Sequence, residues 1–246
     1  MANTSGVTEV QAGGGPMDIF TFTPEGEGKK PGVIVIQEIF GVNDHMKDVA
    51  SRYADEGFVA AAPDLFHREG KGTIVPFDEM ATGGAIRGKL SNDDIIADVT
   101  AAVEYLKSNP DVDGDNIGIV GFCFGGMVSY LAAAKVPGIS AAAIYYGGGI
   151  LPRPDAPADA PRLLDATVDD INVPLIGFWG DADGGIPVAN VALIESTLKS
   201  KGKDYESHVY AGAGHGFFCD ARGSYNEAAA KDAFPRTVEF FKKNLI

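Results

Sequence analysis

Short apolar runs alternate with longer amphipathic stretches along the chain, and this pattern predicts a layered α/β fold. The runs 32–36 and 117–120 are almost entirely aliphatic apart from glycine, as expected of strands covered on both faces. In 92–109, apolar residues recur at the helical period between an opening Asn-Asp-Asp and a closing Asn-Pro. Further strands are expected at 17–22, 58–61, 139–146, 173–179 and 205–210, and further helices at 43–56, 126–135, 187–200 and 225–244. We expect Pro235 to kink or restart the last helix, because proline removes an interior hydrogen bond.

This alternation indicates a single α/β domain spanning residues 1–246, with a mostly parallel sheet and helices on both sides. Residues 1–15 are polar and end in three glycines, so a loose start is expected, which makes 17–22 an edge strand. The glycine-rich segment 64–92 and the Pro/Ala/Asp-rich segment 150–165 are predicted to be surface excursions. The first of them is either a surface insertion or a loop over a site.

The amino-acid composition narrows the range of functions that we expect of this protein. A hydrophobic content of 45% is enough for a sizeable core, while the net charge of −14 argues against general nucleic-acid binding and adsorption to anionic membranes. No apolar run approaches the length of a membrane span, and the N-terminus does not resemble a signal peptide. With only two cysteines a disulfide framework is not implied. We therefore expect a soluble cytoplasmic protein, with a monomer favoured.

The pentapeptide Gly121-Phe122-Cys123-Phe124-Gly125 lies between an apolar strand and a helix. Glycines that flank a nucleophile on a tight strand-to-helix turn are typical of a nucleophile elbow, here with cysteine at its tip. The N–H of Phe124 and the start of the following helix lie close to the sulfur, where they can stabilise a thiolate and later an oxyanion. The alternative is a buried cysteine that packs as a small hydrophobe.

Two more polar residues follow predicted strands. Asp183 and His215 come after Cys123 in the chain order nucleophile, acid, base, which is the order of an α/β-hydrolase. An imidazole lowers the pKa of a neighbouring thiol and then protonates the leaving group, and a carboxylate fixes the tautomer of the imidazole. Asp181 competes for the last role, but the Gly-x-x-Asp spacing favours Asp183. Structural alternatives remain open: Asp183 as a turn former and His215 as a surface residue.

Glu38 stands in Gln37-Glu38-Ile39-Phe40-Gly41, directly after an apolar strand. In an α/β-hydrolase this loop supplies the second N–H of the oxyanion hole, which here is that of Ile39. A carboxylate at this position costs burial energy unless it has a partner. Glu38 is therefore either a solvated turn residue or a group that holds the thiol S–H and accepts its proton.

Together, residues 37–41, 121–126 and 214–217, and Asp183 followed by Gly-Gly-Ile-Pro, resemble the dienelactone hydrolase family. These are carboxymethylenebutenolidases of the α/β-hydrolase fold, and the resemblance covers about residues 15–244. It implies a triad of Cys123, His215 and Asp183 that needs neither cofactor nor metal. It also implies that Glu38 keeps the resting thiol neutral until bound substrate displaces it. The thiolate then attacks a lactone carbonyl, and water cleaves the acyl-enzyme.

The same resemblance implies a small anionic lactone or ester as substrate, with its carboxylate bound by arginine. Arg222 is the best candidate and Arg87 the second. The aromatic residues expected to line the pocket, with core packing as the alternative, are Phe40, Tyr145, Trp179 and Phe217. The cysteines and histidines show no metal-ligand spacing. Two other functions stay open: a redox-active thiol protein and a non-catalytic small-molecule binder.

Overall fold

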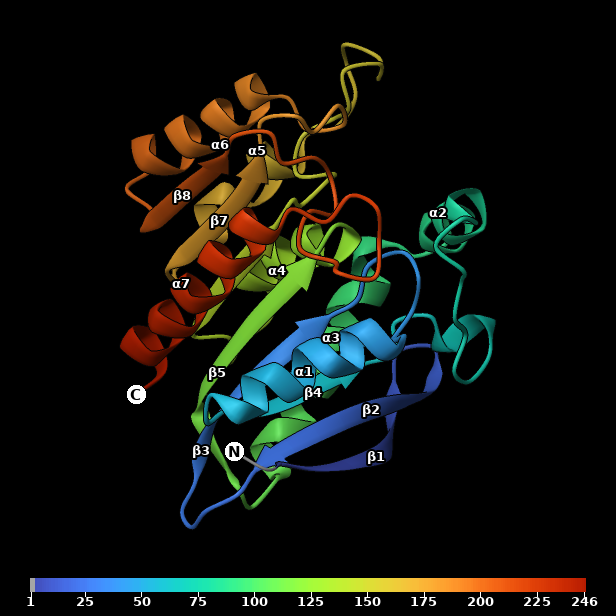
Figure 1. Ribbon diagram of the computed structural model, residues 1–246, viewed down its shortest axis with the longest axis vertical. Helices are drawn as coiled ribbons and strands as arrows, with labels where there is room; N and C mark the ends of the chain where they lie inside the picture. Colours follow the sequence, from blue (N-terminus) through green and yellow to red (C-terminus); the bar gives the residue numbers. More distant parts are fainter. Residues whose placement is uncertain (1–2) are drawn as a thin grey trace.

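The structure, a computed structural model, describes residues 3–246, which form one eight-stranded sheet with helices on both faces (Figure 1). The strands are β1 (Asn3–Ala12), β2 (Gly15–Pro24), β3 (Lys30–Ile36), β4 (Val59–Pro63), β5 (Val112–Phe122), β6 (Ala141–Tyr145), β7 (Leu175–Gly180) and β8 (Tyr205–Tyr210). The helices are α1 (Asp44–Asp55), α2 (Met80–Gly88), α3 (Asn92–Ser108), α4 (Phe124–Lys135), α5 (Leu163–Thr167), α6 (Val188–Ser200) and α7 (Glu227–Leu245), with 3₁₀ turns at His67–Glu69 and Val168–Asp170.

The sheet has the order β1-β2-β4-β3-β5-β6-β7-β8. The pairs β1–β2 and β2–β4 are antiparallel, and the five pairs from β4–β3 to β7–β8 are parallel. On one face α1 and α7 meet through the ring of Tyr53, whose centroid lies 5.1 Å from that of Phe234. On the other face α3 packs beside α4 (Figure 1). The predicted mostly parallel α/β fold is confirmed, and the carboxyl ends of its parallel strands share one edge.

The chain start is not loose where the structure describes it. Residues 3–12 form β1, which pairs with β2 from Asn3 opposite Pro24 to Ala12 opposite Gly15. An edge strand has one neighbour and is largely exposed, so polar residues such as those of β1 are compatible with pairing. The prediction of a loose segment is therefore wrong for 3–15, and 17–22 lies in the second strand rather than at the edge. Residues 1 and 2 lie outside the described part.

The segment 64–92 contains more regular structure than predicted. It includes the 3₁₀ turn and the nine-residue helix α2, whose sequence MATGGAIRG gives little helical signal because of its glycines. Gly83 of α2 packs on the backbone carbonyl of Ile39 so closely that a Cβ would overlap the oxygen. The segment 150–165 follows the prediction until Leu163, where α5 begins. Helix α7 runs continuously through Pro235 instead of restarting there.

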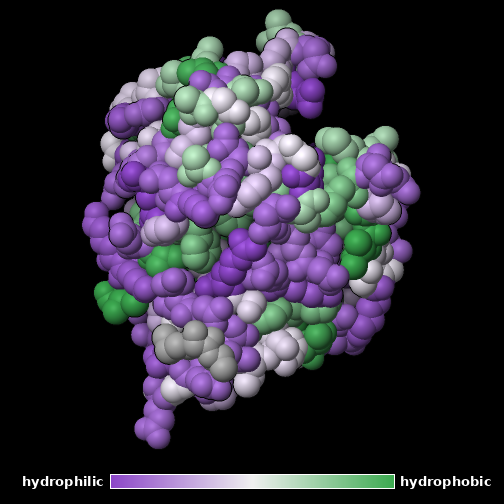
Figure 2. Space-filling model, in the orientation of Figure 1, coloured by the Kyte–Doolittle hydropathy of each residue, from purple (hydrophilic) through white to green (hydrophobic). Residues whose placement is uncertain are grey.

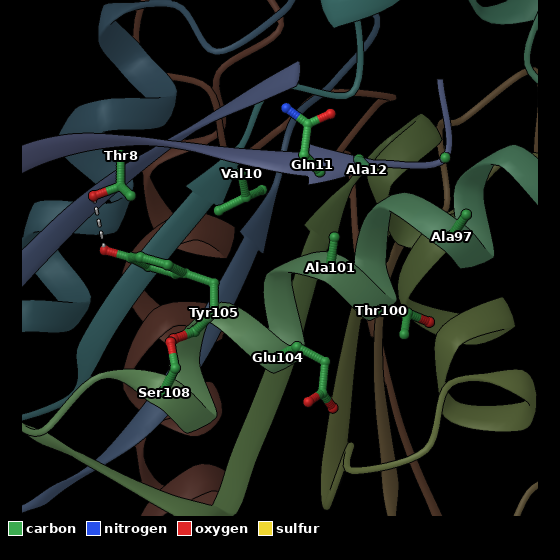
Figure 3. A pocket seen from close by; sticks show the side chains of 11 residues that line it. Thr8, Val10, Gln11, Ala12, Ala97, Thr100, Ala101, Glu104, Tyr105 and Ser108 are labelled. Atoms are coloured by element: carbon green, nitrogen blue, oxygen red, sulfur yellow. Dashed lines mark hydrogen bonds between the residues drawn. The ribbon is translucent and has the colours of Figure 1, made fainter. Parts of the chain in front are cut away.

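A groove of about 620 Å³ lies between the edge strand β1 and α3, and none of the predicted catalytic residues lines it (Figure 3). Its lining includes Tyr105, whose hydroxyl bonds to Thr8 at 3.4 Å and to Thr21 at 2.8 Å. The face shown in Figure 2 is largely hydrophilic, with apolar residues in small groups. Within residues 3–246 there is no helix long and apolar enough to cross a bilayer.

Candidate active site

Cys123 occupies a strained turn between β5 and α4. Its φ of 57° and ψ of −115° are unusual for a residue with a side chain, and its N–H donates to the carbonyl of Tyr145 at 3.0 Å. A Cβ on Gly121 would overlap the carbonyl of Gly125, and one on Gly125 would lie 2.5 Å from the carbonyl oxygen of Ile36. Both elbow glycines are therefore required by close packing. The turn leaves the Cys123 side chain partly exposed.

His215 and Asp183 approach this turn from the loops after β8 and β7. The Nδ1 atom of His215 lies 2.7 Å from Oδ2 of Asp183, and the other oxygen of Asp183 accepts the N–H of Gly185 at 2.8 Å and of Ile186 at 3.1 Å. Asp181 instead accepts the N–H of Gly212. Asp183, which the Gly-x-x-Asp spacing favours over Asp181, is thus the carboxylate that contacts His215.

The electrostatics of the cluster favour a charged pair. Burial lowers the pKa of His215, but its hydrogen bonds to Asp183 and Cys123 and their charges outweigh burial and raise that pKa to about 10. Burial raises the pKa of Asp183, whereas His215 and the two backbone N–H donors bring it below its ordinary value. Both groups thus favour the charged imidazole, which can carry a proton at neutral pH.

Glu38 is buried with only 3% of its surface exposed. Its Oε2 accepts a hydrogen bond from Nη1 of Arg222 at 3.3 Å, while its Oε1 has no partner among the described residues. The guanidinium of Arg222 stacks over Phe40, 5.0 Å from the ring centroid, and over Phe77 at 5.7 Å. The solvated-turn alternative for Glu38 is thus wrong, because this carboxylate is buried beside a single cation.

The N–H groups predicted to hold an oxyanion belong to residues that line one cavity with Cys123. Ile39 and Phe124 both contribute to its wall, together with His215 and Asp183. Neither N–H donates a hydrogen bond to another residue of the described part. Two free donors beside the sulfur are what an oxyanion hole requires.

The cavity has a volume of about 620 Å³ and two unequal walls. One wall is α2, with Met80, Gly84 and Arg87, and the other is the segment from Gly148 to Arg153. These walls project on either side in Figure 1, and Figure 2 shows the surface hollowed between them. Three residues of the segment 64–92 thus line the same cavity as Cys123. The Arg87 guanidinium carbon lies 5.6 Å from the ring centroid of Phe124.

The four aromatic side chains expected in the pocket lie in the core instead. All are at most 1% exposed, and within residues 3–246 the cavity lining contains none of them: Phe40, Tyr145, Trp179 and Phe217. The Tyr145 hydroxyl bonds to Thr237 at 2.6 Å, and Nε1 of Trp179 donates to Tyr205 at 3.0 Å. The sequence predicts which strand or loop carries each aromatic residue, but not how deeply its ring is buried. Arg222 and Glu38 are likewise absent from the lining.

The other cysteine and histidines lie apart from this chemistry. Cys219 is buried, and burial together with the charge of Glu38 raises its thiol pKa to about 12, so it stays protonated. His45, His67 and His208 each contact a carboxylate outside the cavity. Within residues 3–246, His, Cys, Asp and Glu form no cluster of three that could hold a metal ion.

A family model described as "Dienelactone hydrolase family" matches residues 17–245, which is nearly the whole chain. The chain belongs to the dienelactone hydrolase family. It is 39% identical over 224 residues to a "putative carboxymethylenebutenolidase" of Synechocystis sp., covering 90% of this chain and 89% of that protein. This dienelactone hydrolase family member is therefore a carboxylic ester hydrolase, of a family that acts on small lactones or esters.

Two further relatives support the family assignment. A "probable 2-oxo-3-(5-oxofuran-2-ylidene)propanoate lactonase" of Bradyrhizobium sp. is 31% identical, covering 89% of this chain and 86% of its own. The crystal structure of a "putative dienelactone hydrolase" from Klebsiella pneumoniae subsp. pneumoniae superimposes with a TM-score of 0.88 at 30% identity, covering 99% of this chain and 100% of that one. The α/β-hydrolase fold of this family is confirmed.

Several residues that line the candidate site have no motif that marks them in the sequence. Met80 and Gly84 lie in helix α2, which was not predicted, and Arg153 lies in the Pro/Ala/Asp-rich segment. Tyr146, the last residue of the predicted strand 139–146, is followed by the run Gly147-Gly148-Gly149, which indicates a tight turn at the strand end.

Proposed function

We propose that this hydrolase opens small, carboxylate-bearing lactones through an acyl-thioester on Cys123. The observation that carries the proposal is the hydrogen bond between Asp183 and His215, two residues that line one cavity together with Cys123. The sulfur of Cys123 is the proposed nucleophile. His215 is the proton donor and acceptor, and Asp183 orients it. Both cysteines are free, as a thiol nucleophile requires.

Activation starts at the Glu38–Arg222 pair. The carboxylate of the substrate competes for the Arg222 guanidinium, and Glu38 loses its single hydrogen-bond donor. Glu38 then turns toward the sulfur and accepts the thiol proton, so that a thiolate forms only when substrate is present. The 3.3 Å contact and the unpartnered Oε1 support this role, because few bonds must break for Glu38 to move.

The chemical steps follow from the groups around the sulfur. The thiolate attacks the lactone carbonyl, and the N–H groups of Ile39 and Phe124 hold the tetrahedral oxyanion. Collapse breaks the ring C–O bond, and the leaving oxygen takes a proton from His215. His215 then removes a proton from water, whose oxygen attacks the thioester carbonyl. The carboxylic acid departs and the thiolate is regenerated.

Arg87 is the second group proposed to contact the substrate carboxylate. Six of the seven arginines pair with a carboxylate, whereas Arg87 has no such partner among the described residues. It lines the cavity and stacks on Phe124. An unpaired guanidinium in a chain of net charge −14 attracts an anion without first breaking an ion pair.

The proposal is tested with Cys123→Ala, using a dienelactone and an activated aryl ester as substrates. We expect kcat to fall by at least ~10³-fold, since removing a nucleophile disables the whole triad. Mass spectrometry after a single turnover should show the acyl group on Cys123 of the unmodified enzyme. Cys219→Ala is the matched control and should retain turnover. Turnover by Cys123→Ala at the unmodified rate would refute the proposal.

A further inference from the structure

Tyr146 stands directly after β6 in a backbone conformation that residues with side chains rarely adopt. Its φ is 35°, and apart from Cys123 it is the one non-glycine residue in the described part with positive φ. Its N–H donates to the carbonyl of Phe178 at 2.8 Å, and the carbonyl before it accepts the N–H of Cys123 at 3.0 Å. These two hydrogen bonds hold the peptide group between Tyr145 and Tyr146. Residues with such strained backbone conformations cluster at functional sites.

The strained backbone directs the Tyr146 ring under the active site. The ring centroid lies 5.2 Å from that of His215 and 5.0 Å from that of Phe217, and the residue is 1% exposed. Its hydroxyl is buried without a hydrogen-bond partner among residues 3–246. A buried hydroxyl without a partner costs free energy, so its retention needs a reason outside the resting structure.

Oε1 of Glu38 is a second buried polar atom without a partner among residues 3–246. The charge of Glu38 acts on the Tyr146 phenol. Burial, followed by the charges of Glu38, Cys123 and Cys219, holds the pKa of Tyr146 well above its ordinary value, while Arg222 acts in the opposite direction. The phenol therefore stays protonated, and it can donate a hydrogen bond but cannot act as a base.

We propose that Tyr146 is a positioning residue that donates its O–H to Glu38 when the substrate carboxylate takes Arg222 away from it. The proposal rests on the displacement of Glu38 described above. In the resting enzyme Glu38 bonds to Arg222 and the phenol has no partner. With substrate bound, the phenol O–H replaces the guanidinium as donor to Glu38 Oε1, no covalent bond changes, and the carboxylate is held within reach of the thiol.

The test is Tyr146→Phe, assayed with a carboxylate-bearing lactone and with its carboxamide analogue. Loss of a hydrogen bond to a charged group should lower kcat/KM for the carboxylate relative to the carboxamide by about tenfold or more, mainly through KM. The structure gives this variant no bond to lose in the resting state, so its melting temperature should not fall. Equal effects on both substrates, or no effect on either, would overturn the proposal.

Tyr145→Phe is the matched control, because it removes a hydroxyl that does have a partner, Thr237. It should lower the melting temperature without changing the ratio between the two substrates. In a Glu38→Gln background the effect of Tyr146→Phe should disappear if the phenol acts through Glu38. A persistent effect would refute that route.

Arg222→Lys separates this proposal from the function on which it rests. If Arg222→Lys lowers the carboxylate-to-carboxamide ratio and Tyr146→Phe does not, the role of Tyr146 is refuted and the displacement of Glu38 stands. If neither variant changes the ratio, the displacement itself is refuted, and the role of Tyr146 with it.

Discussion

Two buried carboxylates in this hydrolase are each paired with an arginine, yet they are built in opposite ways. Asp98 on α3 accepts hydrogen bonds from both terminal nitrogens of Arg68, and Nε2 of His67 lies 3.3 Å from Oδ1 of Asp98. Glu38 receives one hydrogen bond, from Arg222, and has one oxygen without a partner in the described structure. Both carboxylates are at most 3% exposed. Burial alone therefore does not distinguish them, but the number of bonds does.

The difference shows that a buried ion pair can either stabilise the fold or be ready to rearrange. A saturated pair resists rearrangement, since moving it would leave several buried groups unpaired. A sparse pair loses little when its one bond is exchanged for another. The cluster at Asp98 lies outside the cavity that Cys123 lines, whereas Glu38 pairs with Arg222 and directly precedes Ile39 of the cavity wall. We infer that Asp98 ties α3 to the chain before α2 and that Glu38 is built to move.

The largest effect on stability is expected from Asp98→Asn. Removing this charge leaves Arg68 and His67 without their buried partner, and we expect the free energy of unfolding to fall by about 3 kcal/mol. Urea denaturation measures it. The control is Asp93→Asn, an exposed position on the same helix, which should change stability by less than ~0.5 kcal/mol. An equally stable Asp98→Asn variant would contradict the distinction drawn here.

Glu38→Gln makes the same chemical change in the Glu38–Arg222 pair, which has a single hydrogen bond. In contrast to Asp98→Asn, it should have a large effect on turnover and a small effect on stability. We expect kcat/KM for a carboxylate-bearing lactone to fall about 100-fold, the scale of a lost proton acceptor. Stability should change by less than about 1 kcal/mol, because one hydrogen bond is involved and glutamine still offers an acceptor to Arg222. A large loss of stability with full turnover would show that Glu38, like Asp98, stabilises the fold and takes no part in turnover.

A third effect, independent of the two carboxylates, is a dependence of stability on pH. The pKa of His215 is about 10 in the folded protein and about 6.5 when unfolded. The folded state therefore binds the extra proton between these values. This contribution is fully present below pH ~6.5 and is lost as the pH rises through ~10. Urea midpoints measured from pH 6 to 10 should decline in the unmodified enzyme and decline less in His215→Gln. Identical slopes in both would refute the assignment.

The sequence predicted those parts of the fold that have strong local signals. Continuous aliphatic runs marked β3 and β5, and the glycines around Cys123 marked the elbow. Three elements were not predicted: β1, α2 and the short α5. The local signal of the first two is weak, since β1 is a polar edge strand and α2 contains three glycines. Both depend on tertiary contacts, β1 on its pairing with β2 and α2 on its packing against Ile39.

The candidate site was predictable as a set of residues but not as a set of contacts. Chain order and spacing selected Cys123, Asp183 and His215, because parallel strands end at one edge. Pairing between Glu38 and Arg222 joins residues 184 positions apart, and no local pattern encodes it. The sequence also does not show how deeply an aromatic side chain is buried, so aromatic residues of the core were expected in the pocket.

The close approach of Gly83 to the carbonyl of Ile39 has a consequence for engineering the specificity of this enzyme. The two walls of the cavity are attached differently. The loop from Gly148 to Arg153 can be exchanged for longer or shorter loops without touching the donor at Ile39. Grafting a new helix in place of α2 would shift that donor as well. Libraries that reshape the entrance should therefore diversify the loop first and keep a glycine at position 83.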